Sequence, residues 1–262
     1  MKYVDCKKYA MDILDRVRKR SIKNKLVIIM VGDDLASESY VKGKLKDCEY
    51  CGVPYELVAL DVRTTTEELR SVINKYNFDM SVNGIIVQQP LPRHIDTEVI
   101  INEILPDLDV DGFTNKSPFM PCTPEGIMHI LKKELGELDG LNALIIGRGS
   151  LVGMPMLACL LSANCTVTIA HSHTKNLYDL LQCNDIVVSA AGKPKLVDLA
   201  KCKARIVVDV GVNRDENGKL CGDCYNFNEH DDSNMLVTPV PGGIGLMTRA
   251  MLMKHMGGHY ED

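Results

Sequence analysis

Short apolar runs alternate with amphipathic stretches along most of the chain. The runs 26–31, 55–60 and 84–87 have the length of buried strands. Between them, apolar residues recur at helical spacing, as in segments 37–52 and 66–76. Strands that alternate with helices at crossover spacing predict an α/β fold built on a parallel sheet.

A polar, proline-bearing segment, 106–121, interrupts this alternation. After it the pattern resumes with apolar runs at 143–146, 166–170, 186–189 and 206–210, and a short one at 236–237. We therefore expect a domain boundary within the polar segment, with one domain over 1–118 and the other over 119–246.

The first predicted strand ends in Gly32 and leads to a helix that carries unusual chemistry. Asp33, Asp34 and Ser37 can each cap that helix. Ser37, Tyr40 and Lys44 stand at i, i+3 and i+7, so a hydroxyl, a phenol and an amine share one stripe. The stripe starts at the carboxyl end of a strand, where open α/β sheets bind ligands. On this evidence alone, an ordinary solvated lysine is an open alternative.

A glycine-rich turn follows the run 143–146. Gly147, Gly149 and Gly153 give the spacing G-x-G-x-x-x-G, one residue longer than the dinucleotide fingerprint. Glycines in a strand-to-helix turn let the backbone approach a phosphate closely, with the helix N-terminus facing it. The alternative is a tight turn that binds nothing.

The next strand ends in Ala170 and is followed by His171, Ser172 and His173, without a carboxylate that could hold the ribose of NAD. Arg148 and Ser172, with His173, instead offer donors and positive charge suited to a 2′-phosphate. We therefore predict NADP rather than NAD.

The composition excludes several classes of partner. The 262-residue chain is 45% hydrophobic and 25% charged, with a net charge of -5 and both signs interspersed. No broad basic surface for nucleic acid or for an anionic membrane is implied. No segment reads as a signal core or membrane span, so we expect the cytoplasm.

Ten cysteines include two C-x-x-C pairs, Cys48/Cys51 and Cys221/Cys224. Such spacing can bind zinc or form a redox couple, but the first pair falls inside a predicted helix. We predict ordinary reduced thiols and no metal, and treat His171-x-His173 in the same way; zinc or redox use is the open alternative.

Six motifs, taken in order along the chain, resemble those of one family, the bifunctional methylenetetrahydrofolate dehydrogenase/cyclohydrolases. They are S-x-x-Y-V-x-x-K at 37–44, V-Q-x-P-L-P at 87–92, D-V-D-G-F at 109–113, P-C-T-P-x-G at 121–126, G-R-x-x-x-V-G-x-P at 147–155 and T-P-V-P-G-G at 238–243. The resemblance covers nearly the whole chain.

The resemblance implies two three-layer α/β domains with a cleft between them. The domain over 1–118 would bind folate, with a C-terminal helix at about 247–262 packing back on it. The domain over 119–246 would be a Rossmann domain that binds NADP, and the protein would form a homodimer through these domains.

The resemblance also implies two activities, which serve one-carbon metabolism and purine biosynthesis. The enzyme would oxidise 5,10-methylenetetrahydrofolate to the methenyl form with NADP⁺, then hydrolyse the methenyl form to 10-formyltetrahydrofolate. The first step moves a hydride and no proton, so orientation and electrostatics dominate it. The second step moves protons and needs an acid/base group.

Roles follow from the resemblance position by position. Lys44 would be the acid/base group, Gln88 would position its amine, Tyr40 would stack on the folate, Asp111 would accept hydrogen bonds from the pterin, and Ser37 would support the pocket. Further substrate contacts would come from Pro241 and Gly245, and cofactor contacts from Gly147, Arg148, Gly149, Ser150, His171, Ser172, Val212 and Thr248.

The sequence departs from the family at Leu108 and Leu246, where lysine and proline are frequent, and at Gly149, where serine is frequent. The nearest rival is a dehydrogenase without hydrolase activity, or one that uses NAD. A second rival is a zinc- or redox-regulated binding protein on the same fold. A third is another two-domain NADP oxidoreductase such as a shikimate dehydrogenase, which the D-V-D-G and T-P-V-P-G-G motifs disfavour.

Overall fold

A computed structural model of the chain describes residues 1–114, 116–227 and 234–258. The chain divides into two compact units, each with its own parallel sheet. We call Met11–Cys122 with Arg249–Asp262 the three-stranded unit, and Met1–Ala10 with Thr123–Thr248 the six-stranded unit. The expected α/β class is confirmed.

The three-stranded unit has the strand order β3-β2-β4, all parallel. Its elements are β2 (Lys25–Val31), α2 (Leu35–Cys51), β3 (Tyr55–Leu60), α3 (Thr66–Asn77), β4 (Val82–Val87), α4 (Thr97–Glu103) and the 3₁₀ turn η1 (Pro106–Leu108). Because β2 is the central strand, both of its faces are buried.

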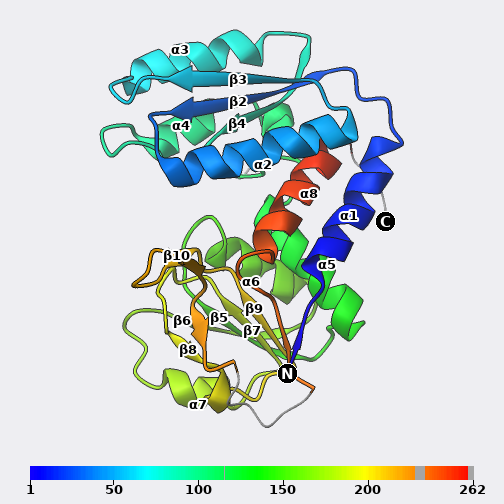
Figure 1. Cartoon of the computed structure of the whole chain (residues 1–262), viewed down its shortest axis with the longest axis vertical. Coiled ribbons are helices and arrows are strands. Elements are labelled where there is room, and N and C mark those ends of the chain that lie inside the picture. Colours follow the sequence, from blue (N-terminus) through cyan, green and yellow to red (C-terminus); the bar gives the residue numbers. More distant parts are fainter. Residues whose placement is uncertain (115, 228–233, 259–262) are drawn as a thin grey trace. The chain divides into compact units, whose positions relative to one another are not determined.

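Alternate residues of β2 face opposite sides of this sheet. Val27 and Ile29 join Leu69 and Ile73 of α3 and Ile100 of α4 in one apolar cluster. Figure 1 shows α2 along the opposite face of the sheet from α3. The crossover from β2 to β3 therefore places the start of α2 at the carboxyl edge of the sheet.

The six-stranded unit has the strand order β1-β13-β9-β7-β5-β6, again all parallel. Its strands are β1 (Lys2–Tyr3), β5 (Asn142–Ile146), β6 (Thr166–Ala170), β7 (Ile186–Ser189), β9 (Ile206–Asp209) and β13 (Leu236–Val237). Small ladders join β8 (Val197–Asp198) to β12 (Cys224–Tyr225) and β10 (Asn213–Arg214) to β11 (Leu220–Cys221). Its helices are α6 (Gly153–Ser162), α7 (Leu177–Leu181) and η2 (Leu199–Lys201), together with most of α5 (Cys122–Leu135).

Helices α1 (Cys6–Arg18) and α8 (Ile244–Met256) each contribute residues to both units. The C-terminal part of α8 belongs to the three-stranded unit, where Arg249 lies beside Asp47 and Cys48 donates to the sulfur of Met253. The segment predicted to pack there, 247–262, begins inside this helix, and its residues 259–262 lie outside the described part.

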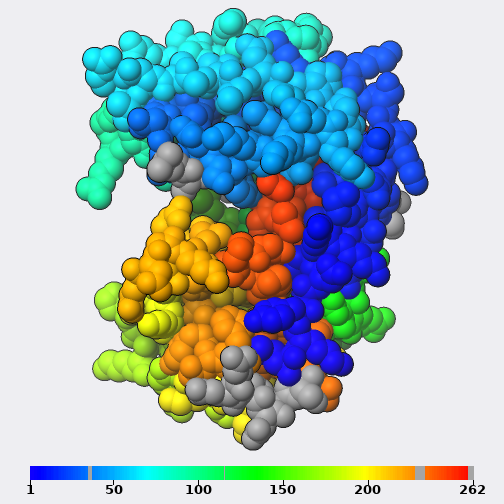
Figure 2. Space-filling model, in the orientation of Figure 1, coloured from blue at the N-terminus to red at the C-terminus, as the bar shows by residue number. Residues whose placement is uncertain are grey.

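The division differs from the predicted one at the N-terminus, since Met1–Ala10 belongs to the six-stranded unit. The cause is the pairing of β1 with β13, in which Lys2 is opposite Leu236 and Tyr3 is opposite Val237. Figure 2 shows the dark-blue N-terminal segment on the surface of this unit. The run 236–237 was expected from the sequence, whereas the two residues of β1 are too few and too exposed to show a strand periodicity.

Candidate active site

The stripe on α2 is positioned by the end of β2. Gly32 has a φ of +83°, which turns the chain, and Asp34 caps the helix by accepting from the backbone N–H of Ser37 at 2.7 Å. The helix thus starts at Leu35, two residues before the predicted start. Ser37 lies in its first turn, with its hydroxyl oxygen buried.

Lys44 is almost completely buried, with 4% of its side chain exposed. Its Nζ lies 3.8 Å from Oδ2 of Asp111 and 5.3 Å from the centre of the Tyr40 ring. The first distance is too long for a hydrogen bond, so the amine lies near a carboxylate and an aromatic ring and is held by electrostatic attraction to both. The solvated-lysine alternative is therefore wrong.

Gln88 follows β4 directly and is held at the strand end because its backbone N–H donates to Ile29 at 2.8 Å. Its side-chain Nε2 donates to the carbonyl of Gln89, while its Oε1 is buried and accepts no hydrogen bond from the described residues. The Ser37 hydroxyl is buried in the same way. Leaving such atoms unpaired costs ~1–3 kcal/mol each, so both oxygens are available to accept or exchange hydrogen bonds with a bound molecule.

Asp111 is aimed at Lys44 by a loop that Asp109 organises. The Asp109 carboxylate is 1% exposed and accepts from the backbone N–H groups of Gly112, Phe113 and Thr114 at 3.1, 3.3 and 2.7 Å. Burial raises the pKa of Asp109, and these bonds oppose the rise. Sequence analysis assigned no role to Asp109, although the D-V-D-G spacing was its signal.

The far end of this loop is fixed by α8. His255 is hydrogen-bonded through Nδ1 to the carbonyl of Val110 at 2.7 Å, and its ring stacks on Phe119 with centroids 4.5 Å apart. Cys122 donates to the same carbonyl, at 3.3 Å. Thus Lys44, Tyr40 and Asp111 come together, whereas Ser37 and Gln88 lie in the same unit without a hydrogen bond to Lys44 in the described residues.

The glycine turn of the six-stranded unit is tightly packed at two of its glycines. A side chain at Gly147 would lie 2.5 Å from the carbonyl oxygen of Ala190, and one at Gly153 would lie 2.3 Å from that of Gly147. Gly147 also has a φ of +117°. At Gly149 a side chain would meet nothing, so the departure there is sterically neutral. Helix α6 has no side-chain cap, which suits a backbone cradle for phosphate.

The end of β6 forms a compact turn. The backbone N–H of His171 donates to the Thr174 hydroxyl, and that of His173 donates to Nδ1 of His171 at 3.2 Å. Ser172 and Arg148 are exposed on neighbouring parallel strand ends. This edge presents positive charge and hydroxyl groups without a carboxylate, as the prediction of NADP requires.

The remaining predicted contacts differ in their surroundings. Val212 is 72% exposed, and Pro241, Gly245 and Ser150 are also exposed. The Thr248 hydroxyl is instead engaged by the protein, 2.9 Å from the hydroxyl of Thr123 and 3.1 Å from the carbonyl of Ile244.

All four cysteines of the two C-x-x-C pairs are free thiols. Burial raises the pKa of Cys48 and Cys51 to about 12, and burial also raises the pKa of Cys224 well above its ordinary value. In the described ranges, no three His, Cys, Asp or Glu side chains gather as metal ligands. Nothing in these surroundings favours the zinc or redox alternative.

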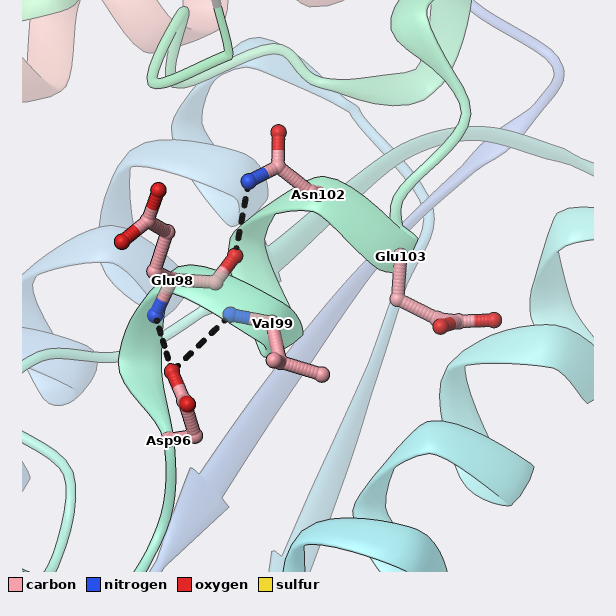
Figure 3. A pocket seen from close by; sticks show the side chains of 5 residues that line it. All are labelled: Asp96, Glu98, Val99, Asn102 and Glu103. Carbon is pink, nitrogen blue, oxygen red and sulfur yellow. Dashed lines mark hydrogen bonds between the residues drawn. The ribbon is translucent and has the colours of Figure 1, made fainter.

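A separate depression lies at the start of α4 (Figure 3) and is lined by Asp96, Glu98, Val99, Asn102 and Glu103. Asp96 caps the helix by accepting from the backbone N–H groups of Glu98 and Val99, and Asn102 donates to the carbonyl of Glu98. Asp96 and Asn102 are thus engaged within the helix, and the Glu103 carboxylate accepts from Arg70 and Asn74 of α3.

Two α/β units with parallel sheets, one with a glycine turn of the phosphate-binding type and one with a buried lysine facing an aspartate, define the class of nucleotide-dependent enzymes. Family models agree: residues 4–111 match the catalytic domain of tetrahydrofolate dehydrogenase/cyclohydrolase, and 121–261 match its NAD(P)-binding domain. The chain belongs to the tetrahydrofolate dehydrogenase/cyclohydrolase family.

Individual relatives are similar over almost their whole length. The bifunctional protein FolD of Agathobacter rectalis is 43% identical over 249 residues, which are 91% of this chain and 89% of that protein. The crystal structure of the Campylobacter jejuni bifunctional enzyme FolD matches with a TM-score of 0.92 at 39% identity, over 98% of this chain and 97% of that one.

A third match carries a cofactor. The Trypanosoma brucei methylenetetrahydrofolate dehydrogenase-cyclohydrolase, complexed with NADP and an inhibitor, matches with a TM-score of 0.90 at 30% identity, over 97% of this chain and 95% of that one. Shikimate dehydrogenase of Aquifex aeolicus, at 13% identity and a TM-score of 0.52, shares the fold alone. No helix among the described residues is long and apolar enough to cross a membrane.

Proposed function

We propose that this protein oxidises 5,10-methylenetetrahydrofolate to the methenyl form with NADP⁺ and hydrolyses that product to 10-formyltetrahydrofolate. The observation that carries the proposal is the buried Lys44 amine, whose Nζ lies 3.8 Å from Oδ2 of Asp111 and 5.3 Å from the centre of the Tyr40 ring. The family membership and the bifunctional relatives support it.

NADP⁺ supplies the hydride acceptor of the first step. The close packing of the turn requires glycine at 147 and 153, since a side chain at either position would strike backbone atoms, and backbone N–H groups of this turn would hold the phosphates. Arg148 and Ser172 meet the 2′-phosphate at the ends of β5 and β6. The other cofactor contacts we propose are Gly149, Ser150, His171, Val212 and Thr248.

In the hydrolytic step, Lys44 accepts a proton from the water that adds to the bridging carbon and returns one to the departing ring nitrogen. The Asp111 carboxylate accepts hydrogen bonds from the NH groups of the pterin and lies near enough to orient the Lys44 amine. Tyr40 stacks on the folate, and Gln88 and Ser37 use their unpaired oxygens within the pocket. Pro241 and Gly245 complete the substrate contacts.

The test is a product assay that follows NADPH, methenyl and 10-formyl products together, with NAD⁺ in parallel. Lys44→Met should lower hydrolysis ~10²–10⁴-fold, the usual contribution of an acid/base group, and leave hydride transfer within about tenfold. Lys42→Met is the matched control, because Lys42 is on the same helix with 71% of its side chain exposed. Equal loss of both activities in Lys44→Met would contradict this division of labour.

A dehydrogenase that lacks hydrolase activity is the second candidate, and the same assay separates it. NADPH formation with accumulation of the methenyl product would favour it, and comparable rates with NAD⁺ would favour an NAD-dependent enzyme. The buried Lys44 argues against the first outcome, since hydride transfer needs no proton-transfer group.

We further propose that the protein is a homodimer formed through the six-stranded unit. Strand β6 is a sheet edge, and α6 beside it exposes Met154, Ala158 and Leu161 on one stripe. Sedimentation should show a dimer that Leu161→Arg weakens and Phe78→Arg, at an exposed site of the other unit, does not. A monomer in both cases would refute the interface.

Ten free cysteines fit a reducing compartment, which supports the cytoplasm.

A further inference from the structure

Two buried aspartates in the six-stranded unit lie outside every role described so far. Asp209 ends β9 and is 1% exposed, and Asp223 precedes β12 and is 0% exposed. In the part of the chain that the structure describes, neither forms an ion pair with lysine or arginine. Buried carboxylates of this kind are stabilised by hydrogen-bond donors, and those donors show what the carboxylates hold.

The Asp223 carboxylate gathers donors from the end of β7, from the loop that follows it and from β10. Its Oδ2 accepts from the Ser189 hydroxyl at 2.8 Å and from the backbone N–H of Ala191 at 3.0 Å. Its Oδ1 accepts from the backbone N–H of Lys193 at 2.8 Å and from the Asn213 side chain at 2.9 Å. The carboxylate therefore joins the loop after β7 to the loop after β9.

The Asp209 carboxylate in turn fixes Asp223 and the second loop. It accepts from the backbone N–H groups of Gly211, Asp223 and Cys224 at 3.0, 2.9 and 2.9 Å. The backbone N–H of Asp209 donates to the Thr238 hydroxyl, which begins the T-P-V-P-G-G segment. Burial raises the pKa of Asp209, and the backbone donors oppose that rise.

Two glycines make room for the pair. A side chain at Gly211 would lie 2.2 Å from Oδ1 of Asp223, and one at Gly222 would lie 2.0 Å from Oδ2 of Asp209. The two carboxylates thus occupy the space that side chains at positions 211 and 222 would fill. Glycine at these two positions is therefore a requirement of the buried pair.

The loops that the pair holds lie where a dinucleotide bound at the glycine turn must continue. The order β9-β7-β5-β6 puts them on the opposite side of β5 from His171 and Ser172. Loop 190–193 touches the turn directly, since a side chain at Gly147 would lie 2.5 Å from the carbonyl of Ala190. A cofactor with its phosphates held at Gly147 and its 2′-phosphate at the end of β6 would reach the ends of β7 and β9 with its nicotinamide half.

We infer that Asp223, supported by Asp209, is a positioning residue that fixes loops 190–193 and 211–213 against the nicotinamide half of NADP. Val212 lies between the two tethered residues Gly211 and Asn213 and is 72% exposed, so the pair presents an apolar side chain at the edge where the ring lies. This inference rests on the proposed function, because it assigns the loops to that cofactor.

The ratio of dehydrogenase to hydrolase activity distinguishes a positioning role of Asp223 from a merely structural one. Hydrolysis of methenyltetrahydrofolate needs no nicotinamide, and its proposed acid/base group lies in the other unit. A displaced loop should therefore change hydride transfer and cofactor binding alone. General loss of folding should lower both activities together.

The first variant is Asp223→Asn. It replaces one accepting oxygen by an NH₂ group, which cannot accept the hydrogen bonds that this oxygen receives from its donors. We expect kcat/KM for NADP⁺ to fall ~10²-fold, the effect of a displacement of about 1 Å, with hydrolysis within about twofold. Asn213→Ala removes one donor from Asp223 and should change the same ratio in the same direction by less.

The matched control is Asp198→Asn. Asp198 is a buried carboxylate of the same unit that accepts from Asn226 and Ala200 and holds neither loop. It should lower the melting temperature without changing the ratio of dehydrogenase to hydrolase activity.

If Asp223→Asn fails to fold, Asn213→Ala decides. The inference is overturned if the folded variants keep both the KM for NADP⁺ and the dehydrogenase kcat within about twofold of wild type, or if Asp198→Asn shifts the activity ratio equally. Wild-type protein that reduces neither NADP⁺ nor NAD⁺ would instead contradict the proposed function, which separates the two failures.

Discussion

Gly43 stands next to Lys44, and its missing side chain gives space to Arg249 of α8. A methyl group there would lie 1.7 Å from Nη1 and 2.8 Å from Cζ of Arg249. The guanidinium cannot simply swing away, since its Nε lies 2.9 Å from Oδ2 of Asp47, with 20% and 12% of the two side chains exposed. The N–H does not point along this line, so the contact is an ion pair rather than a hydrogen bond.

The cost of Gly43→Ala follows from these contacts. Separating a buried pair costs ~3–5 kcal/mol, and burial already raises the pKa of Asp47, so its unpaired carboxylate is unfavourable there. Alanine in place of glycine within a helix returns ~1 kcal/mol. We therefore expect Gly43→Ala to lower the free energy of unfolding by ~2–4 kcal/mol.

The assay is urea unfolding of a double-mutant cycle. Arg249→Ala should be destabilising by itself, since it leaves Asp47 unpaired. In that background Gly43→Ala should become stabilising by ~1 kcal/mol, because the obstructing group is gone. The coupling should reach ~3–5 kcal/mol. Additive effects of the two substitutions would refute the steric argument.

Three further outcomes follow from other parts of the molecule. Under native conditions at pH 8, a thiol reagent should modify exposed Cys183 quickly and Cys48 and Cys51 hardly at all, because a pKa of about 12 leaves a thiolate fraction of ~10⁻⁴. Mass spectrometry of the labelled peptides measures the three rates. Fast labelling of Cys48 and Cys51 would favour the redox alternative. Asp109→Asn should lower the free energy of unfolding by ~1–3 kcal/mol, because the Asp109 carboxylate accepts from three backbone N–H groups of the loop that carries Asp111. It should also raise the KM for folate and leave the KM for NADP⁺ unchanged. Steady-state kinetics with each substrate varied measures both, and a constant folate KM would contradict the prediction. Arg148→Ala should raise the KM for NADP⁺ about tenfold and leave that for NAD⁺ nearly unchanged, and an equal rise for both would contradict its place at the 2′-phosphate.

The sequence predicts most of the local structure. The buried strands were placed to within two residues, and the helix of Lys44 was recognised from its spacing. The sequence also predicts the glycine turn. A side chain at position 147 or 153 would strike backbone atoms, so glycine is required at both positions and the requirement is visible as their spacing. Such features depend on neighbours within a few turns of chain, which a linear pattern records.

Tertiary structure alone decided how distant segments share a unit. The pairing of β1 with β13 and the ion pair of Arg249 with Asp47 join residues that are far apart in sequence. The same holds for Asp223, whose four donors come from β7, from the loop after it and from β10. A single aspartate looks alike in sequence whether it is solvated or buried among donors, because burial and hydrogen bonding arise only when the chain has folded around it.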